Sequence, residues 1–236
     1  MNEPPILEIS ELTKRFGGVT AVNRCSLALW PGRIYGLIGP NGSGKTTLFN
    51  CITSLEVRDS GAIHFRGRRI DGLPSHRVAN LGVGRTFQVI RVFPELTALE
   101  NLLVVSRDDR GAAMGRAREL LAFVRLEGLS GEHAGNLSYG QQKLLEFVRV
   151  LMLEPALVLL DEPAAGVNRT LLNDLLGAIR RLRDEGRTVL IVEHDMKVVM
   201  GQCERVFVLD GGEKIAEGPP EVIQADERVI EAYFGR

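Results

Sequence analysis

Short runs of alternating apolar and polar residues predict β-strands in the first part of the chain. In residues 19–29, Cys25, Leu27 and Leu29 alternate with polar neighbours, which is typical of a strand with one buried face. Further strands are expected over residues 6–12 and 61–67 and at the apolar positions Ile34, Leu37 and Ile38. The part of the chain before residue 70 is therefore expected to be rich in β-structure.

Beyond residue 89 the apolar residues recur at helical intervals. This spacing is carried by Leu96, Leu99, Leu102 and Leu103, and again by residues 114–126. A polar, glycine-containing stretch at residues 108–111 separates the two groups and is expected to be a link. We therefore predict a small helical subdomain over residues 89–137.

The remaining chain alternates helical and strand patterns. A helix is predicted to begin after Ser138, because Ser138 and Gln141 form the S-x-x-Q pattern of a capping box, and to end before Pro155. Its apolar residues lie on one stripe, made of Leu144, Leu145, Phe147, Val148, Leu151 and Met152. Strands are then expected at 157–160, 188–192 and 206–209, with helices at 169–185 and 195–202. This β-α-β-α-β series predicts a parallel sheet with helices on its faces.

A phosphate-binding loop of the form G-x-x-x-x-G-K-T lies between an apolar strand and a helix expected at residues 44–53. Its residues and the one that follows are predicted to contact a nucleotide: Gly39, Pro40, Asn41, Gly42, Ser43, Gly44, Lys45, Thr46 and Thr47. Glycines let the backbone N–H groups approach a phosphate closely, and Lys45 can reach the β- and γ-phosphates. The hydroxyl of Thr46 can ligate Mg²⁺. The strand and helix around the motif disfavour the alternative of a chance glycine turn, so the chain is predicted to bind a nucleoside triphosphate.

Two acids follow the apolar strand at 157–160. Asp161 is placed at the carboxyl edge of the sheet, where ligands of open α/β sheets bind, and is expected to hold Mg²⁺ together with Thr46. Glu162 is expected to polarise a water for attack on the γ-phosphate. The alternative, a solvated turn with two acids, is disfavoured by the phosphate loop upstream.

Two further polar residues follow strand-like segments. His194 comes after the apolar run 189–192 and could donate a hydrogen bond to a γ-phosphate oxygen. Gln88 ends the strand-like segment 84–88 and could contact Mg²⁺-bound water. Taken singly, each is more often an ordinary polar surface residue, so both assignments depend on the other motifs.

Composition limits the classes of partner. The chain has 236 residues and a formal net charge of −1, so no overall positive field indicates a nucleic-acid partner. Its three cysteines, Cys25, Cys51 and Cys203, lack C-x-x-C spacing, and neither a disulfide framework nor a zinc site is expected. The N-terminus does not have the pattern of a signal peptide, and no apolar run is long enough to span a bilayer. A reduced, cytosolic setting is expected.

Taken in order, these motifs resemble the nucleotide-binding subunit of an ATP-binding cassette (ABC) transporter. The deciding addition is a segment similar to the L-S-G-G-Q signature of that family, Leu137-Ser138-Tyr139-Gly140-Gln141. The resemblance implies an α/β fold: a P-loop NTPase core with a mostly parallel sheet, an N-terminal antiparallel β subdomain and an inserted α-helical subdomain. It divides the chain into residues 1–88, 89–137 and 138–236, with ATP and Mg²⁺ as cofactors.

The resemblance also implies roles for individual residues. Lys45, Gln88, Glu162 and His194 match catalytic positions, and Thr46, Gln88 and Asp161 match metal positions. Phe16 matches an aromatic that stacks on adenine, although core packing is the alternative. Ser138, Gly140 and Gln141 match signature residues that contact the ATP held by a second ATPase subunit in a head-to-tail pair. Tyr139 and Asn168 depart from the family pattern, where glycine and aspartate are usual, at positions that bear on coupling between the paired sites.

Several strings resemble the branched-chain amino acid importer subgroup, including 84–88, 137–142, 161–166, 193–196 and 229–235. That subgroup implies two membrane permease subunits, a second ATPase subunit that is a copy or a paralogue, and an external solute-binding protein reached indirectly. It places the chain at the cytoplasmic face of the inner membrane.

Four alternative assignments share part of this motif pattern. They are the ATPase of a lipid or lipopolysaccharide exporter, a chromosome-maintenance ATPase, a translation-linked cassette protein and a nucleotide sensor without turnover. Only residues 47–136 separate the phosphate loop from the signature, and they lack the heptads of the long coiled coil that a chromosome-maintenance ATPase has there. The chain has one cassette, whereas translation-linked proteins have two. Glu162 and His194 argue against a sensor.

Overall fold

The computed structural model describes residues 3–234, and its larger sheet is mostly parallel, as the sequence predicts. From one edge to the other it contains β10 (Glu213–Gly218), β9 (Arg205–Asp210), β3 (Ile34–Ile38), β8 (Thr188–Val192), β7 (Leu157–Asp161) and β6 (Val83–Arg85). All neighbours pair in parallel except β9 and β10. Every residue of β3, β7 and β8 is buried, because helices or the second sheet cover both faces of the sheet.

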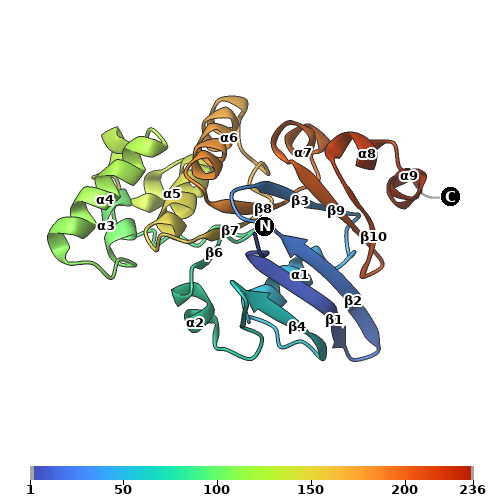
Figure 1. The fold of residues 1–236 in the computed structure, drawn as a ribbon. Helices are drawn as coiled ribbons and strands as arrows, with labels where there is room; N and C mark the ends of the chain where they lie inside the picture. Colours follow the sequence, from blue (N-terminus) through green and yellow to red (C-terminus); the bar gives the residue numbers. More distant parts are fainter. Residues whose placement is uncertain (1–2, 235–236) are drawn as a thin grey trace.

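A smaller antiparallel sheet forms the β subdomain. Its order is β2 (Val19–Leu29), β1 (Leu7–Phe16), β4 (Ser60–Phe65) and β5 (Arg68–Arg69), and Figure 1 shows β1, β2 and β4 side by side near α1. Helix α1 (Lys45–Ile52) lies between the two sheets, since Leu48, Phe49 and Ile52 share one apolar core with residues of both. The phosphate loop that precedes α1 is thereby held between the sheets.

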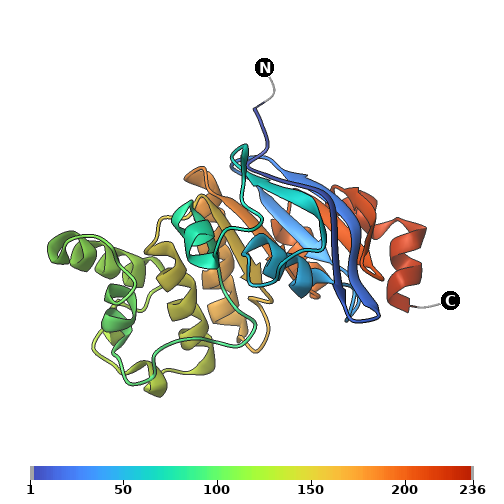
Figure 2. The same cartoon turned by 90° about the horizontal axis from the view of Figure 1, so that it is seen from below.

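The other helices pack against the larger sheet or extend beyond its two ends. They are α2 (Ser75–Asn80), α3 (Ala98–Leu103), α4 (Arg110–Phe123), α5 (Tyr139–Leu151), α6 (Arg169–Asp184), α7 (Met196–Gln202), α8 (Pro220–Gln224) and α9 (Glu227–Phe234). Short 3₁₀ turns follow α4 at Glu127–Leu129 and Ala134–Asn136. In Figures 1 and 2, α3 and α4 form a lobe at one end of the molecule, and α8 and α9 lie at the other.

The predicted capping box at the start of α5 is confirmed. The hydroxyl oxygen of Ser138 accepts from the amide of Gln141 at 3.4 Å, and Oε1 of Gln141 accepts from the amide of Ser138 at 2.9 Å. The helix ends at Leu151, before Pro155. Local sequence therefore sets both ends of this helix.

Several local predictions were wrong. The polar stretch at 108–111 is not wholly a link, because Asp109 accepts from two backbone amides and begins α4 at Arg110. The segment 84–88 is a strand only to Arg85, so Gln88 lies in a loop. Helix α2 and strand β10 were not predicted. Residues 1, 2, 235 and 236 lie outside the described part, as do the portions of the predictions on the N-terminus and on the string 229–235 that fall there.

Candidate active site

The phosphate loop joins β3 to α1, and its glycines are required by close backbone contacts. A Cβ on Gly39, whose φ is 150°, would lie 2.0 Å from the carbonyl oxygen of Leu209, and one on Gly44, whose φ is 100°, would lie 2.3 Å from that of Ala21. Nothing lies within 4 Å of the corresponding position on Gly42. The loop is thus anchored at both ends and open at its tip.

The start of α1 is suited to an anion. Its N-cap residue makes no side-chain hydrogen bond to the helix, and no acidic residue lies in the first turn. The ammonium of Lys45 is buried and donates to the carbonyl oxygens of Gly39 at 2.8 Å and Pro40 at 2.9 Å. Burial lowers the pKa of Lys45. A phosphate offers this cation a stronger, charged acceptor than the two carbonyls, so the loop fits a nucleoside triphosphate.

The two acids after β7 have different surroundings. Asp161 is buried and forms an ion pair with Arg85, with 3.0 Å between Nη2 and Oδ2. Burial raises the pKa of Asp161, and the guanidinium of Arg85 opposes that rise. Glu162 has a left-handed backbone with φ of 49°, and its amide donates to the carbonyl of Val192 at 2.9 Å. For a residue other than glycine this conformation stores about 1–3 kcal/mol of strain, which the surrounding contacts must hold.

Three of the predicted catalytic side chains meet at the carboxylate of Glu162. Nε2 of Gln88 donates to Oε2 of Glu162 at 3.3 Å. Nδ1 of His194 lies 3.9 Å from Oε1 of Glu162 and 3.8 Å from Oε2 of Glu193. The carboxylate of Glu162 is partly exposed, so a water molecule can reach it. The chain thus places an acid, an amide and an imidazole together at the edge of the sheet.

Two buried charged residues that the sequence reasoning missed hold this arrangement. Oε1 of Glu193 accepts from the amide of Ala164 at 2.8 Å, and Oε2 accepts from the amide of His194 at 3.0 Å, so the turns after β7 and β8 are tied together. Arg85 also donates to Oδ1 of Asn50 on α1, at 2.7 Å. The available signal was that Arg85 lies inside a strand and that Glu193 directly follows one.

Phe16 and the signature residues lie apart from this cluster. Phe16 ends β1 and is 46 % exposed, with Nζ of Lys14 4.7 Å from its ring centroid, so the alternative of core packing is wrong. Gly140 packs against Leu171 of α6. Within residues 3–234, no hydrogen bond joins the start of α5, where Ser138 and Gln141 lie, to the phosphate loop of the same chain.

The two departures from the family pattern have local explanations. The ring of Tyr139 lies against Gly166, where a Cβ would be 2.7 Å from Cε1 of the tyrosine. Asn168 is the N-cap of α6, and its Oδ1 accepts from the amide of Leu171 at 3.0 Å. Asparagine and aspartate cap helices about equally well, so this substitution preserves the start of α6.

The sequence profile of the ABC transporter family matches residues 22–165, which include the phosphate loop, the signature and both acids. The chain belongs to the ABC transporter family. A second profile, that of the branched-chain amino acid ATP-binding cassette transporter, matches residues 213–236.

Relatives of this ABC protein align over nearly the whole chain. It is 43 % identical to the high-affinity branched-chain amino acid transport ATP-binding protein BraF of Pseudomonas aeruginosa and 40 % identical to LivG of Escherichia coli, each alignment covering 98 % of both chains. It is 37 % identical to the lipopolysaccharide export system ATP-binding protein LptB of Escherichia coli, over 97 % of both chains.

Solved structures agree with the fold. A nucleotide-free ATP-binding cassette from an ABC transporter superposes with a TM-score of 0.90 at 32 % identity, over 98 % of this chain and 100 % of the other. The dimeric bacterial ABC transporter cassette MJ0796 superposes with a TM-score of 0.82 at 26 % identity, over 91 % and 98 %. The predicted fold class, a P-loop NTPase core with a β subdomain and inserted helices, is therefore correct, and the ABC fold binds ATP.

The donor set around the site fits a magnesium ion that nucleotide phosphates help to bind. No cluster of three or more His, Cys, Asp or Glu side chains within residues 3–234 could hold a metal by itself. Thr46, on the first turn of α1, is exposed, and Asp161, at the end of β7, has the carboxylate that would join it as a ligand. Mg²⁺ is commonly held by one or two protein oxygens, waters and phosphate oxygens, which matches this set.

No helix in the described part of the chain is long and apolar enough to cross a membrane.

Proposed function

We propose that this chain is the ATP-hydrolysing subunit of an ABC importer for branched-chain or related amino acids. The observation that carries the proposal is the convergence of Gln88 and His194 on Glu162, beside a phosphate loop with an open tip. The names of BraF and LivG, together with the profile match at residues 213–236, support amino acids as the cargo. The subunit does not bind the cargo itself; it drives the permeases that do.

In this proposal the loop residues 39–47 and the start of α1 bind the triphosphate, and the ring of Phe16 stacks on adenine. Glu162 orients a water and takes its proton as the water attacks the γ-phosphate. His194 donates to a γ-phosphate oxygen, and Gln88 senses whether that phosphate is present. Mg²⁺, held by Thr46 and Asp161 and approached by Gln88, would neutralise charge on the phosphates. Lys45 would stabilise the same charge with its ammonium group.

We further propose that a second ATPase subunit completes each site. The start of α5 does not contact the phosphate loop of its own chain, and the related cassette MJ0796 is dimeric. In a head-to-tail pair, Ser138, Gly140 and Gln141 of one subunit would cover the ATP of the other. Because ATP would then bind the closed pair better than the open one, binding would drive closure. The segments 1–88 and 138–236 would form the nucleotide core, and residues 89–137 would be a separate helical unit.

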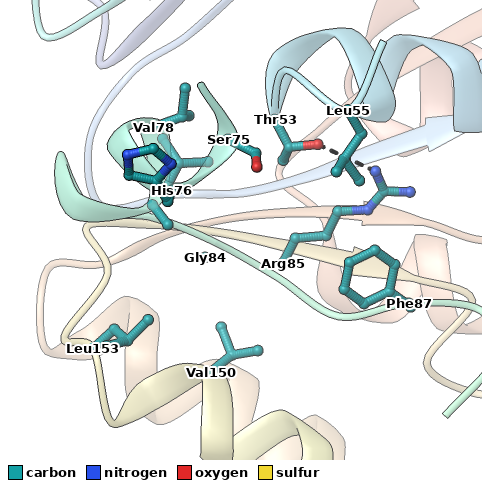
Figure 3. Close-up of a pocket in the computed structure, with 12 residues that line it drawn as sticks. Thr53, Leu55, Ser75, His76, Val78, Gly84, Arg85, Phe87, Val150 and Leu153 are labelled. Atoms are coloured by element: carbon teal, nitrogen blue, oxygen red, sulfur yellow. Dashed lines mark hydrogen bonds between the residues drawn. The ribbon is translucent and has the colours of Figure 1, made fainter. Parts of the chain in front are cut away.

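The permease partner is proposed to dock at a cavity of about 280 Å³ that adjoins the Gln88 loop. Figure 3 shows Ser75, His76 and Val78 of α2 on one side of it, with Val150 and Leu153 on the other. Phe87, next to Gln88, also lines the cavity. Two apolar residues near this region, Leu55 and Val89, are 47 % and 76 % exposed. A permease segment seated here would place the subunit at the cytoplasmic face of the inner membrane, with the external solute-binding protein reached only through the permease.

A second candidate function is the ATPase of a lipopolysaccharide or other lipid exporter, which the similarity to LptB favours. The identity to BraF is higher, 43 % against 37 %, and the C-terminal profile is that of the branched-chain amino acid subgroup. Purification of the chain with its membrane partners, followed by mass spectrometry, separates the two. Permeases that copurify with a soluble amino acid receptor support import, whereas partners that bridge the periplasm support export.

The hydrolytic role is tested by Glu162→Gln, which keeps the shape of the side chain and removes the base. We expect retained ATP binding, a fall in kcat of about 10²–10⁴-fold, and accumulation of a dimer that size-exclusion chromatography detects. Glu119→Gln, on the surface of α4, is the matched control and should hydrolyse ATP at the parent rate. Turnover by Glu162→Gln at near the parent rate would show that this carboxylate is not the base.

A further inference from the structure

Helix α5 carries two buried charged side chains that the proposed mechanism does not use. Lys143 is 8 % exposed and Glu146 is 3 % exposed. They are three residues apart, so they lie on the same side of the helix, beside the apolar stripe. Burial of a charge is costly unless hydrogen bonds compensate, so the partners of these two residues are informative.

Lys143 binds the backbone that carries the proposed base. Its Nζ donates to the carbonyl oxygen of Glu162 at 2.8 Å and to that of Ala165 at 2.6 Å. These two contacts hold both ends of the turn after β7, where Glu162 adopts its left-handed conformation. A strained backbone of this kind persists only while such contacts hold it.

Glu146 binds the backbone of the loop that carries Gln88. Its Oε1 accepts from the amide of Arg91 at 3.1 Å. Burial raises the pKa of Glu146, and the nearby backbone amide of Phe87 is one of the groups that oppose this rise. Gln88 lies between these two amides in the chain. A cavity of about 20 Å³ lies beside Lys143, Glu146 and Asp161. It has room for about one water, so the two charges have few alternative partners.

We propose that Lys143 and Glu146 are positioning residues that set Glu162 and Gln88 around the γ-phosphate and make their placement depend on the signature helix. The inference rests on the proposed function, since it assigns the way one helix supports that site. Gly140, at the start of α5, would face the ATP of the partner subunit, while Lys143 and Glu146, on the following turns, contact the catalytic loops of their own site. A shift of this one helix on closure would therefore move both loops, and the two sites would be coupled.

The test compares Glu146→Ala with Glu146→Gln. Alanine removes the acceptor, whereas glutamine keeps one carbonyl oxygen for the amides of Arg91 and Phe87. In Glu146→Ala we expect kcat to fall by about ten- to a hundredfold, because small misplacements of catalytic groups have effects of that order. The affinity for ATP, measured by titration with a fluorescent analogue, should stay within about twofold, since the phosphate loop is untouched. Glu146→Gln should restore most of kcat.

Lys143→Met provides a second, independent arm. It removes the donor to the carbonyl oxygens of Glu162 and Ala165 while roughly keeping the length of the side chain. As in Glu146→Ala, kcat should fall while the affinity for ATP stays nearly unchanged. Steady-state hydrolysis is measured on the purified full chain, with circular dichroism to confirm folding. Glu119→Ala, on the surface of α4, is the control for loss of a carboxylate.

Each outcome decides the proposal. A folded Glu146→Ala variant with the parent kcat would overturn it, as would a loss of ATP affinity as large as the loss of kcat. If Glu146→Ala does not fold, Glu146→Leu fills the same volume, and unfolding of both variants would also count against a positioning role. Failure of the proposed function is distinct, because then the parent chain itself would not hydrolyse ATP, or Glu162→Gln would remain active.

Discussion

Replacement of Arg85 by methionine tests the view that a buried ion pair joins α1, β6 and β7 at the active site. The guanidinium donates to Oδ1 of Asn50 at 2.7 Å, to the hydroxyl of Thr53 at 3.3 Å and to Asp161 at 3.0 Å. It also lies over the rings of Phe49 and Phe87, 5.5 Å and 5.1 Å from their centroids. Methionine retains much of the apolar contact but leaves the carboxylate of Asp161 without its cation.

The magnitude follows from burial. The side chains of Arg85 and Asp161 are only 6 % and 2 % exposed, so water cannot replace the lost partner. Removal of one member of such a pair costs about 3–5 kcal/mol. For a chain of this length each kcal/mol lowers Tm by about 2–4 °C, so we expect a decrease between about 6 and about 20 °C at neutral pH.

The loss of folding stability in Arg85→Met should depend on pH. Burial already raises the pKa of Asp161, and removal of Arg85 takes away a group that opposes this rise. A carboxyl whose pKa is raised in the folded state favours folding when protonated, and this contribution is lost as pH rises through the folded-state pKa. The difference in stability between Arg85→Met and the parent should therefore be smaller at about pH 4 than at about pH 7.

Thermal unfolding followed by circular dichroism, with variant and parent compared at each pH, measures both effects. Arg228→Met is the control, because its ion pair with Asp226 is on the surface, where solvent screens the two charges, and its Tm should stay close to that of the parent. The double variant Arg85→Met with Asp161→Asn should recover part of the loss, since no unpaired charge remains. A Tm within 2 °C of the parent at neutral pH, or a deficit that does not shrink on acidification, would refute the reasoning.

Two further predictions concern the nucleotide site. Gly39→Ala places a Cβ 2.0 Å from the carbonyl oxygen of Leu209, so it should weaken ATP binding more than about tenfold in a titration and lower Tm. Gly115→Ala is the control, because its Cβ would lie in open space on α4, and it should keep or slightly raise Tm. Normal ATP affinity in Gly39→Ala would contradict the loop geometry. Phe16→Ala should weaken ATP binding on the order of tenfold with little change in Tm, because the ring is 46 % exposed and stacking on a base contributes about 1–3 kcal/mol. Unaltered binding of ATP would argue against stacking on adenine.

The sequence was sufficient for features that depend on neighbouring residues. The capping box of α5 needs only Ser138 and Gln141, and the phosphate loop needs only glycines and a lysine at fixed spacing between a strand and a helix. The parallel sheet followed from the alternation of apolar strands with helices. Placement of Asp161, Glu162 and His194 at one edge followed from that sheet, because the carboxyl ends of parallel strands meet there.

The sequence was not sufficient where a second segment changes the surroundings of a residue. Lys143 and Glu146 lie outside the apolar stripe of α5, and the helical pattern alone places them toward solvent. In the fold, the turn after β7 and the Gln88 loop cover that side of the helix and bury both charges. Helix α2 was missed because six residues are too few for a clear periodic pattern.

What the chain determined by itself is therefore the kind of chemistry: a loop that binds a triphosphate, an acid that follows a buried strand, and the order of motifs that indicates the family. Only the tertiary structure decided which charges are buried and what they hold. Arg85 and Asp161 are 76 positions apart, and Lys143 reaches Ala165 across 22. Local spacing sets backbone conformation, but the free energy of a buried charge depends on partners that folding brings from distant parts of the chain.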